Sequence, residues 1–198
     1  AVEFTEDYDK EYVASLRLGV VTNTQDTTGE ILEEHPVRAG RQELEAVLEQ
    51  FRGDILQVPP MYSAIKVNGK KLYELARKGR EVERRSRPVT ISALELLGQE
   101  ENGDWRLRVE CSKGTYIRTL CHDIGQALGC GGTMSALRRT RVGPFTEGIA
   151  LEQVQQAADE GRGEELLAPA EGCFIHLPAV SADRRVRDKF ILNGAPYP

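Results

Sequence analysis

Residues 89–128, VTISALELLGQEENGDWRLRVECSKGTYIRTLCHDIGQAL, contain the pattern that decides the fold class. Two strand-like segments, Val89–Leu97 and Trp105–Cys111, flank the tetrapeptide Glu101-Asn102-Gly103-Asp104, which is typical of a tight hairpin turn. Apolar residues alternate in the second segment, so they should share one buried face of a strand. Those residues are Trp105, Leu107, Val109 and Cys111. This stretch therefore predicts a pair of antiparallel strands.

A helix is predicted directly after the hairpin, over Tyr116–Leu128. Its apolar residues recur at helical spacing and form a single stripe, as expected of a helix that packs on a core. The stripe consists of Ile117, Leu120, Cys121, Ile124, Ala127 and Leu128. Thr115 is a candidate N-cap, and Gly129 follows the end, where glycine commonly terminates a helix.

Upstream of the hairpin, the chain alternates between strand-like and helix-like segments. Tyr12–Val20 alternates apolar with polar residues, which indicates a half-buried strand, and residues 22–29 (TNTQDTTG) form a polar loop. A helix is predicted to begin near Arg41 and to end at Gly53. Residues 58–61 (VPPM) exclude a helix, because proline lacks the backbone donor and restricts the residue before it.

Two further helices complete the expected secondary structure. Ile65–Val67 indicates a strand that enters a turn at Asn68-Gly69, and a short basic helix should follow at Leu72–Lys78. Another helix is predicted at Leu151–Ala158. Strands and helices in mixed order, joined by hairpins, predict an α+β fold around a mostly antiparallel sheet.

The composition is that of an ordinary globular protein, with 40% hydrophobic and 29% charged residues. No run of about 18 apolar residues is present, so no membrane span is expected. The opening residues, AVEFTEDYDKEY, are too acidic for a signal peptide. The four cysteines form no CxxC pair and the three histidines lack ligand spacing to them, so we expect buried thiols in a reducing cytosol and no metal site.

The net charge of −5 disfavours a polyanionic partner, but the charges are distributed unevenly. Residues 66–87 contain nine basic residues against three acidic ones, and Arg138, Arg139 and Arg141 form a second basic cluster. A locally basic surface attracts a polyanion even on an acidic protein. Charge alone is equally compatible with a solvated face.

Three segments together resemble the bacterial tRNA pseudouridine synthase B (TruB) family. The first runs from Lys10-Glu11-Tyr12 to Gly29 and includes Thr24-Gln25-Asp26. The second is residues 58–69 (VPPMYSAIKVNG). The third is residues 112–118 (SKGTYIR), which continue into Gly129-Cys130-Gly131 and Leu137-Arg138-Arg139. Their order and spacing are similar to those of the family from about Asp9 to about Pro178.

The resemblance implies a pseudouridine synthase-like fold, with a mixed, mostly antiparallel sheet flanked by helices and an RNA-clasping insertion at residues 59–88. It implies a cytoplasmic isomerase that converts uridine to pseudouridine in the T loop of tRNA, at position 55. The implied partner is the T-arm stem-loop of tRNA, without a membrane or a protein partner. No cofactor and no metal are implied, because the reaction is a redox-neutral isomerisation.

The resemblance also implies roles for particular residues. Tyr12 would stack on the flipped base, Leu137 would pack under it, and Asp26 would be an acidic loop residue near the site. Arg118 would pair with the catalytic aspartate and hold it ionised. From the residues alone, Tyr12 and Leu137 are also compatible with core positions and Asp26 with a turn. The predicted RNA-contacting residues are Lys66, Lys70, Lys71, Arg77, Lys78, Lys113, Tyr116, Arg138 and Arg139.

One feature of the family is not matched. Family members carry the nucleophilic aspartate in a glycine-rich motif upstream of the Lys-Glu-Tyr strand, and neither Asp7 nor Asp9 lies in such a motif. We therefore expect a fragment that is inactive alone, with an incomplete catalytic domain (1–178) and the start of a C-terminal RNA-binding, PUA-like domain (179–198). Arg118 would then lack its partner unless another acid or water enters.

Two other hypotheses remain open at this stage. The first is a non-catalytic module that grips tRNA without turnover. The second is a generic α+β protein with no role in RNA chemistry, which predicts no binding to the T arm.

Overall fold

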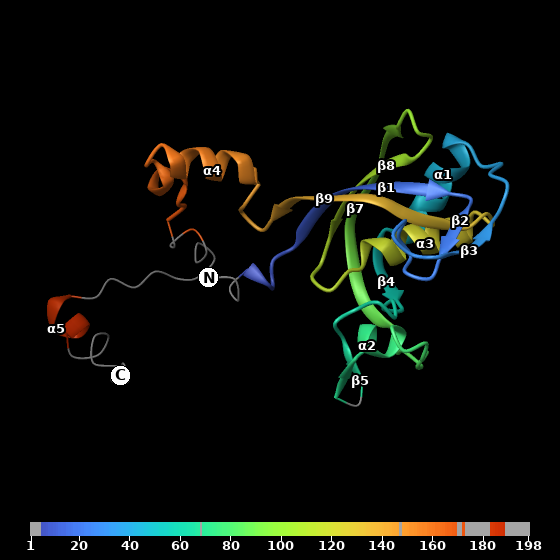
Figure 1. Ribbon diagram of the computed structural model, residues 1–198, viewed down its shortest axis with the longest axis horizontal. Helices are drawn as coiled ribbons and strands as arrows, with labels where there is room; N and C mark the ends of the chain where they lie inside the picture. Colours follow the sequence, from blue (N-terminus) through green and yellow to red (C-terminus); the bar gives the residue numbers. More distant parts are fainter. Residues whose placement is uncertain (1–4, 68, 147, 170–171, 173–182, 189–198) are drawn as a thin grey trace.

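A five-stranded antiparallel sheet, ordered β4-β7-β8-β1-β9, forms the framework of the computed structural model (Figure 1). The structure describes residues 5–67, 69–146, 148–169, 172 and 183–188. The strands of the sheet are β4 (Gly53–Gln57), β7 (Arg87–Gln99), β8 (Trp105–Cys111), β1 (Lys10–Leu18) and β9 (Gly132–Val142). The predicted α+β class with a mostly antiparallel sheet is confirmed.

Two short hairpins and the helices make up the rest of the described secondary structure. Two short hairpins pair β2 (Val20–Thr22) with β3 (Ile31–Glu34) and β5 (Lys66–Val67) with β6 (Lys70–Lys71). The helices in the described part of the chain are α1 (Arg41–Leu48), α2 (Leu72–Ala76), α3 (Ile117–Ala127), α4 (Leu151–Asp159) and α5 (Arg184–Val186), with 3₁₀ turns at Glu49–Phe51 and Gly163–Leu166. The predicted C-terminal unit at 179–198 lies outside the described residues except for 183–188.

Strands β7 and β8 form the predicted hairpin. Its turn is closed by hydrogen bonds from the Glu100 amide to the Asp104 carbonyl (2.8 Å) and from the Gly103 amide to the Glu100 carbonyl (2.9 Å). Gly103 has a φ of 87°, a conformation that favours glycine. The residues predicted to share the buried face of β8 are all buried, namely Trp105, Leu107, Val109 and Cys111.

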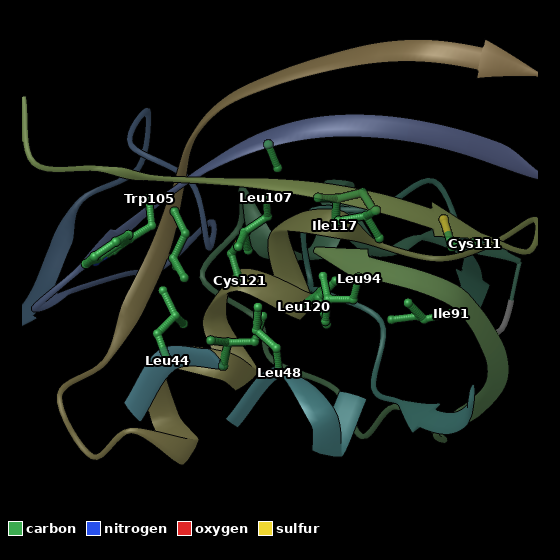
Figure 2. Packing of buried hydrophobic residues seen from close by; sticks show 14 residues of the cluster. Leu44, Leu48, Ile91, Leu94, Trp105, Leu107, Cys111, Ile117, Leu120 and Cys121 are labelled. Carbon is green, nitrogen blue, oxygen red and sulfur yellow. The ribbon is translucent and has the colours of Figure 1, made fainter. Parts of the chain in front are cut away.

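Helices α1 and α3 supply the other half of the core (Figure 2). Leu44 and Leu48 of α1, together with Leu120 and Ile124 of α3, are at most 1% exposed. Burying a side chain of this size stabilises the fold by about 1.5–3 kcal/mol. The core therefore lies between one face of the sheet and these two helices, and α3 is held firmly against β9 and β1.

The cysteines of the described residues are structural. Cys111, Cys121 and Cys130 are free and buried, as predicted, whereas Cys173 lies outside the described residues. Burial raises the pKa of Cys111 to about 11 and that of Cys121 to about 12. Both are therefore neutral thiols near neutral pH and are poorly suited to act as nucleophiles.

Several predicted boundaries are wrong. The strand expected over Tyr12–Val20 is interrupted at Gly19, where a φ of 84° turns the backbone between β1 and β2. Only glycine fits there, because a Cβ would lie 2.8 Å from the His35 carbonyl oxygen. The helix expected to run to Gly53 ends at Leu48 and passes through a 3₁₀ turn into β4. Strands β3, β4 and β9 were not predicted, and β9 supplies the edge of the sheet next to β1.

The opposite face of the sheet is polar and carries one deeply buried charge. The Asp104 side chain is 3% exposed, accepts two hydrogen bonds from Arg17 (2.9 and 3.0 Å) and one from Ser135 (2.5 Å). Burial acts most strongly on the pKa of Asp104 and would raise it, but the bonds from Arg17, Ser135 and Asn102 outweigh burial and lower the pKa. Asp104 thus ties the β7–β8 hairpin to β1 and β9.

Replacing Asp104 with asparagine is expected to lower the free energy of unfolding by roughly 1–2 kcal/mol at pH 7, since Asp104 is buried but solvent around the 42% exposed Arg17 weakens the pair. Because the pKa is lowered in the folded state, the ionic contribution is present above the usual carboxyl pKa of about 3.9 and is lost as pH falls through the lowered value. Urea unfolding at several pH values should show the difference between wild type and Asp104→Asn shrinking below about pH 4. A difference that is constant with pH would contradict this ion-pair role.

Candidate active site

The polar loop between β2 and β3 is fixed to the beginning of β9. The Thr27 amide donates to the Met134 carbonyl (3.0 Å), and the Met134 amide donates to the Gln25 carbonyl (3.1 Å). Gln25 adopts a φ of 64°, unusual for a residue other than glycine, and its side chain accepts a bond from Thr119 of α3 (2.7 Å). Contacts with two elements therefore place this loop beside the first turn of α3.

Asp26 in this loop pairs with Arg118 in the first turn of α3. Arg118 Nη1 lies 3.0 Å from Asp26 Oδ2, and the two side chains are 28% and 17% exposed. Asp26 also accepts bonds from the Thr28 amide (3.0 Å), the Thr28 hydroxyl (2.5 Å) and the Thr24 hydroxyl (2.9 Å). Asp26 is both a turn residue, as its sequence context indicates, and the partner of the arginine.

The charge state of Asp26 follows from these contacts. Burial is the largest influence on its pKa and would raise it, but the hydrogen bonds from Thr28 and Thr24 and the charge of Arg118 together outweigh it. The pKa of Asp26 is therefore lowered, and the carboxylate stays ionised near neutral pH. Arg118 was expected to lack a partner unless another acid or water entered. Asp26 is that acid, and it neutralises the partly buried charge of Arg118.

The start of α3 is held in a way that the sequence did not indicate. Tyr116 occupies the N-cap position without a side-chain cap, and the predicted cap is wrong: the Thr115 hydroxyl donates to the Ser112 carbonyl (2.9 Å). Instead, the Gln57 side chain bonds both the amide and the carbonyl of Tyr116, at 2.7 and 3.0 Å. Gln57 lies at the end of β4, 59 residues away in the chain.

Tyr12, Leu137 and Arg139 lie on one face of the sheet, the face that α3 covers. In the β1–β9 pairing Tyr12 is opposite Arg139 and Ala14 is opposite Leu137, and directly paired residues point to the same side. Leu137 is 44% exposed, so it is not a core residue. Tyr12 is half-buried and packs against the core, and Arg139 lies opposite it on the neighbouring strand.

Burial raises the pKa of Tyr12, although the neighbouring Arg139 opposes this effect. Tyr12 is therefore a neutral phenol near neutral pH. Arg138, predicted together with Arg139, pairs with Val13 and so points to the opposite face of the sheet. The structure separates these two arginines and leaves only Arg139 beside Tyr12.

The predicted RNA-contacting residues of the insertion are mostly free and exposed. Lys66, Lys70, Arg77 and Lys78 are exposed on the β5–β6 hairpin and around α2. Lys71 is half-buried, with its Nζ 3.4 Å from the Tyr73 hydroxyl, and Arg77 lies over the Tyr73 ring at 5.4 Å from its centre. The Tyr73 ring thus orients two of these cations.

Lys113 differs from the other predicted RNA-contacting residues, because it is already engaged. Its ammonium forms an ion pair with Asp7, and the hydrogen bond from Lys113 lowers the pKa of that exposed carboxyl. Lys113 and Tyr116 line a hollow of about 560 Å³ together with Arg87 and Ile65 of the insertion. Arg87 and Ile65 also line a neighbouring hollow of about 340 Å³ with Lys66, Arg84 and Arg85.

Two adjoining hollows therefore connect the insertion with the start of α3. The sequence did not single out Arg84, Arg85, Arg87 or Gln57 as site residues. The basic run was a visible signal for the three arginines, whereas no local pattern marks Gln57.

Across the described ranges, no group of three or more histidine, cysteine or acidic side chains is arranged to hold a metal ion. No helix there is long and apolar enough to cross a membrane.

Comparison with known sequences finds that the chain matches the models of one protein family. Residues 1–117 match the model of the TruB family pseudouridylate synthase N-terminal domain, and residues 118–174 match the tRNA pseudouridylate synthase B C-terminal domain. The tRNA pseudouridine synthase B of Stutzerimonas stutzeri is 52% identical over 200 residues, covering 98% of this chain and 65% of that protein. Its counterpart from Ralstonia pickettii is 47% identical over 206 residues, covering 100% and 64%. The chain thus spans slightly less than two thirds of these relatives.

Solved structures agree with the fold. A Cbf5-Nop10-Gar1 complex contains a chain that superposes with a TM-score of 0.65 at 31% identity, covering 89% of this chain and 46% of that one. An H/ACA RNP bound to a substrate RNA containing 2'-deoxyuridine gives a TM-score of 0.61 at 28% identity, covering 89% and 45%. Both likenesses cover 89% of this chain.

Proposed function

The chain belongs to the TruB family of pseudouridylate synthases, and from this premise we propose that the protein isomerises uridine to pseudouridine in the T loop of tRNA. The observation that carries the proposal is the Asp26–Arg118 pair at the start of α3, the helix that packs on the sheet face of Tyr12, Leu137 and Arg139. We place the activity in the cytoplasm, which accords with the free buried thiols of Cys111 and Cys121.

The reaction breaks the bond between C1' of the ribose and N1 of uracil. The base then turns, a C1'–C5 bond forms, the proton on C5 is released and N1 gains a proton, so no oxidant or cofactor is consumed. A base in a folded RNA loop must leave its stack to react, at a cost of a few kcal/mol. Stacking on an aromatic side chain returns about 1–3 kcal/mol per base.

The face that carries Tyr12 suits this task. The Tyr12 ring is half-buried and packs against the core, so it can accept a base with little loss of side-chain entropy. Leu137 is an exposed apolar neighbour on the same face, and its exposure leaves it available to a bound base. We assign stacking to Tyr12 and the apolar floor under the base to Leu137.

Arg118 would orient the nucleophilic aspartate of the reaction. Within the described residues, the hydrogen bonds of its guanidinium, to Asp26 and the Thr24 carbonyl, both use Nη1. A guanidinium has five N–H donors in a fork that matches a carboxylate, so Nη2 and Nε remain available for a second one. Asp26 would hold the fork in place. We assign the nucleophile to neither Asp7, which is engaged by Lys113, nor Asp9.

The insertion would hold the T arm of the RNA by its phosphates. Lys66, Lys70, Arg77 and Lys78 supply exposed positive charge, and Arg87 joins the two hollows that lead to Tyr116 at the start of α3. Phosphate contacts position an RNA without reading its sequence, and the shape of the folded loop provides selectivity. A non-catalytic RNA-gripping module would share this surface but would produce no pseudouridine.

Mapping of the modified nucleotide tests the proposal. The full natural protein that contains this chain is incubated with unmodified transfer RNA, and pseudouridine is located by carbodiimide labelling and primer extension. We expect one modified uridine, in the T loop, and the same result with an isolated T-arm stem-loop. Modification elsewhere in the tRNA would contradict the assignment of the T arm, and RNA binding without modification would favour the non-catalytic module.

A further inference from the structure

Gln57 is a buried polar residue that the proposed chemistry does not use directly. It is the last residue of β4 and is 2% exposed. Its Oε1 accepts a bond from the Tyr116 amide at 2.7 Å, and its Nε2 donates to the Tyr116 carbonyl at 3.0 Å. A side-chain amide buried in this way would be costly without partners, so the two bonds are expected to persist.

Tyr116 is the residue from which α3 starts. It is the N-cap, with extended backbone angles (φ −98°, ψ 104°), and no side chain caps the helix there. Arg118 follows two residues later, in the first helical turn, with its Nη1 at 3.0 Å from Asp26. A shift of the Tyr116 backbone would move the guanidinium relative to Asp26 and to any carboxylate bound beside it.

Gln57 also lies where the chain enters the insertion. Pro59 and Pro60 follow within three residues, and the Pro59 carbonyl accepts a bond from Arg84 at 3.2 Å at the other end of the insertion. The same side chain therefore joins the root of the RNA-contacting insertion to the first residue of α3. Among the described residues, no other side chain bonds both backbone groups of Tyr116.

We propose that Gln57 is a positioning residue for the reaction: its carboxamide fixes the Tyr116 backbone and thereby holds Arg118 in its productive place. This inference rests on the proposed function, because it concerns the arginine of that site. Misplacing a reactive group by about 1 Å can cost on the order of a hundredfold in rate. Gln57 acts through Tyr116 and Arg118 and does not itself touch the RNA.

Two variants separate hydrogen bonding from packing. Gln57→Met keeps a similar volume but makes neither bond. Gln57→Glu retains an acceptor for the Tyr116 amide and loses the donor to the Tyr116 carbonyl; Arg87, opposite position 57 in the β4–β7 pairing, would favour its ionised form. The matched control is Gln99→Met, which removes a side-chain bond to the Gly103 carbonyl (2.9 Å) in the β7–β8 hairpin.

The first readout needs no catalysis and uses this chain. The Nε–H resonance of Arg118 is followed by NMR, with that of Arg17, which bonds Asp104, as the internal reference. We expect Gln57→Met to shift the Arg118 resonance or speed its exchange, Gln57→Glu to have a smaller effect, and Gln99→Met to have none. An unchanged Arg118 signal in a folded Gln57→Met or Gln57→Glu variant would overturn the proposal.

The second readout is the split between kcat and KM in the full natural protein. Gln57→Met should lower kcat roughly ten- to a hundredfold, with KM for tRNA within about twofold and Gln57→Glu in between. A rise in KM with unchanged kcat would mean that Gln57 serves RNA docking only, and a lowered melting temperature with unchanged kcat would mean a purely structural role. If the wild-type protein formed no pseudouridine, the proposed function would be rejected. The NMR signal of Arg118 would then still show whether Gln57 positions that arginine.

Discussion

Replacing Arg118 with lysine is expected to lower kcat of the full natural protein by roughly a hundredfold or more, while leaving affinity for tRNA within a few fold. The lysine keeps the positive charge but has no planar fork, so it cannot hold Asp26 and a second carboxylate in the geometry that Nη1, Nη2 and Nε allow. Single-turnover kinetics on tRNA together with equilibrium binding measure the two quantities separately.

Arg17→Lys provides a matched control for this substitution. Arg17 also bonds an aspartate, Asp104, but lies on the polar face of the sheet, opposite the face of Tyr12. We expect Arg17→Lys to change stability and to leave kcat within about twofold. A large loss of RNA affinity in Arg118→Lys at unchanged kcat would show that Arg118 binds RNA and does not orient a catalytic carboxylate.

The double substitution of Lys70 and Lys71 with glutamate is expected to raise the dissociation constant for the T-arm stem-loop about tenfold or more at low salt. It should also flatten the salt dependence, since each lost phosphate contact reduces the slope of log K against log salt by about 0.7–0.9. Lys70 is exposed and Lys71 lies against Tyr73, so the first should contribute more. Titration of a labelled stem-loop at several salt concentrations provides the measurement.

Arg38→Glu is the control for charge reversal as such, because Arg38 is an exposed arginine on the segment before α1, outside the insertion. Its effect should be small and the salt slope should be unchanged. Equal affinities of the wild type and the Lys70/Lys71 variant, at every salt concentration, would remove the insertion from the RNA-binding surface.

The parts of the fold that could be predicted from sequence are those specified by local pattern. The β7–β8 turn follows from Asn102-Gly103, whose conformational preferences act within four residues. Helix α3 follows from an apolar stripe and a terminal glycine, and its bounds differ from the predicted ones by only one residue at each end. Both features bury one face of a regular element, which leaves a clear period in the sequence.

The elements that were missed have no such pattern. Strand β9 is an edge strand whose residues from Ala136 to Arg139 are all exposed, so its apolar alternation is lost. Strand β3 is exposed at every residue, and β4 has only five residues. These strands form because β1 and β7 offer them backbone partners, a long-range effect that short-range pattern does not encode.

The candidate site, too, could be predicted from the sequence only in part. Family resemblance predicted Tyr12, Asp26, Arg118 and Leu137 as site residues, but it did not indicate that Asp26 pairs with Arg118 across 92 residues. The two hydrogen bonds between the Gln57 side chain and the Tyr116 backbone likewise join distant segments, and neither residue spacing nor composition predicts them. Arg138 and Arg139 are neighbours in the sequence, yet strand geometry places them on opposite faces.

Release of tritium from tRNA labelled at C5 of uridine tests the central claim most directly, because the C5 proton is lost only if the new carbon–carbon bond forms at that position. The full natural protein is expected to release tritium in proportion to the pseudouridine formed, up to one equivalent per tRNA, and its Arg118→Lys variant to release it far more slowly. No release above background by wild-type protein that binds the T-arm stem-loop would contradict the account.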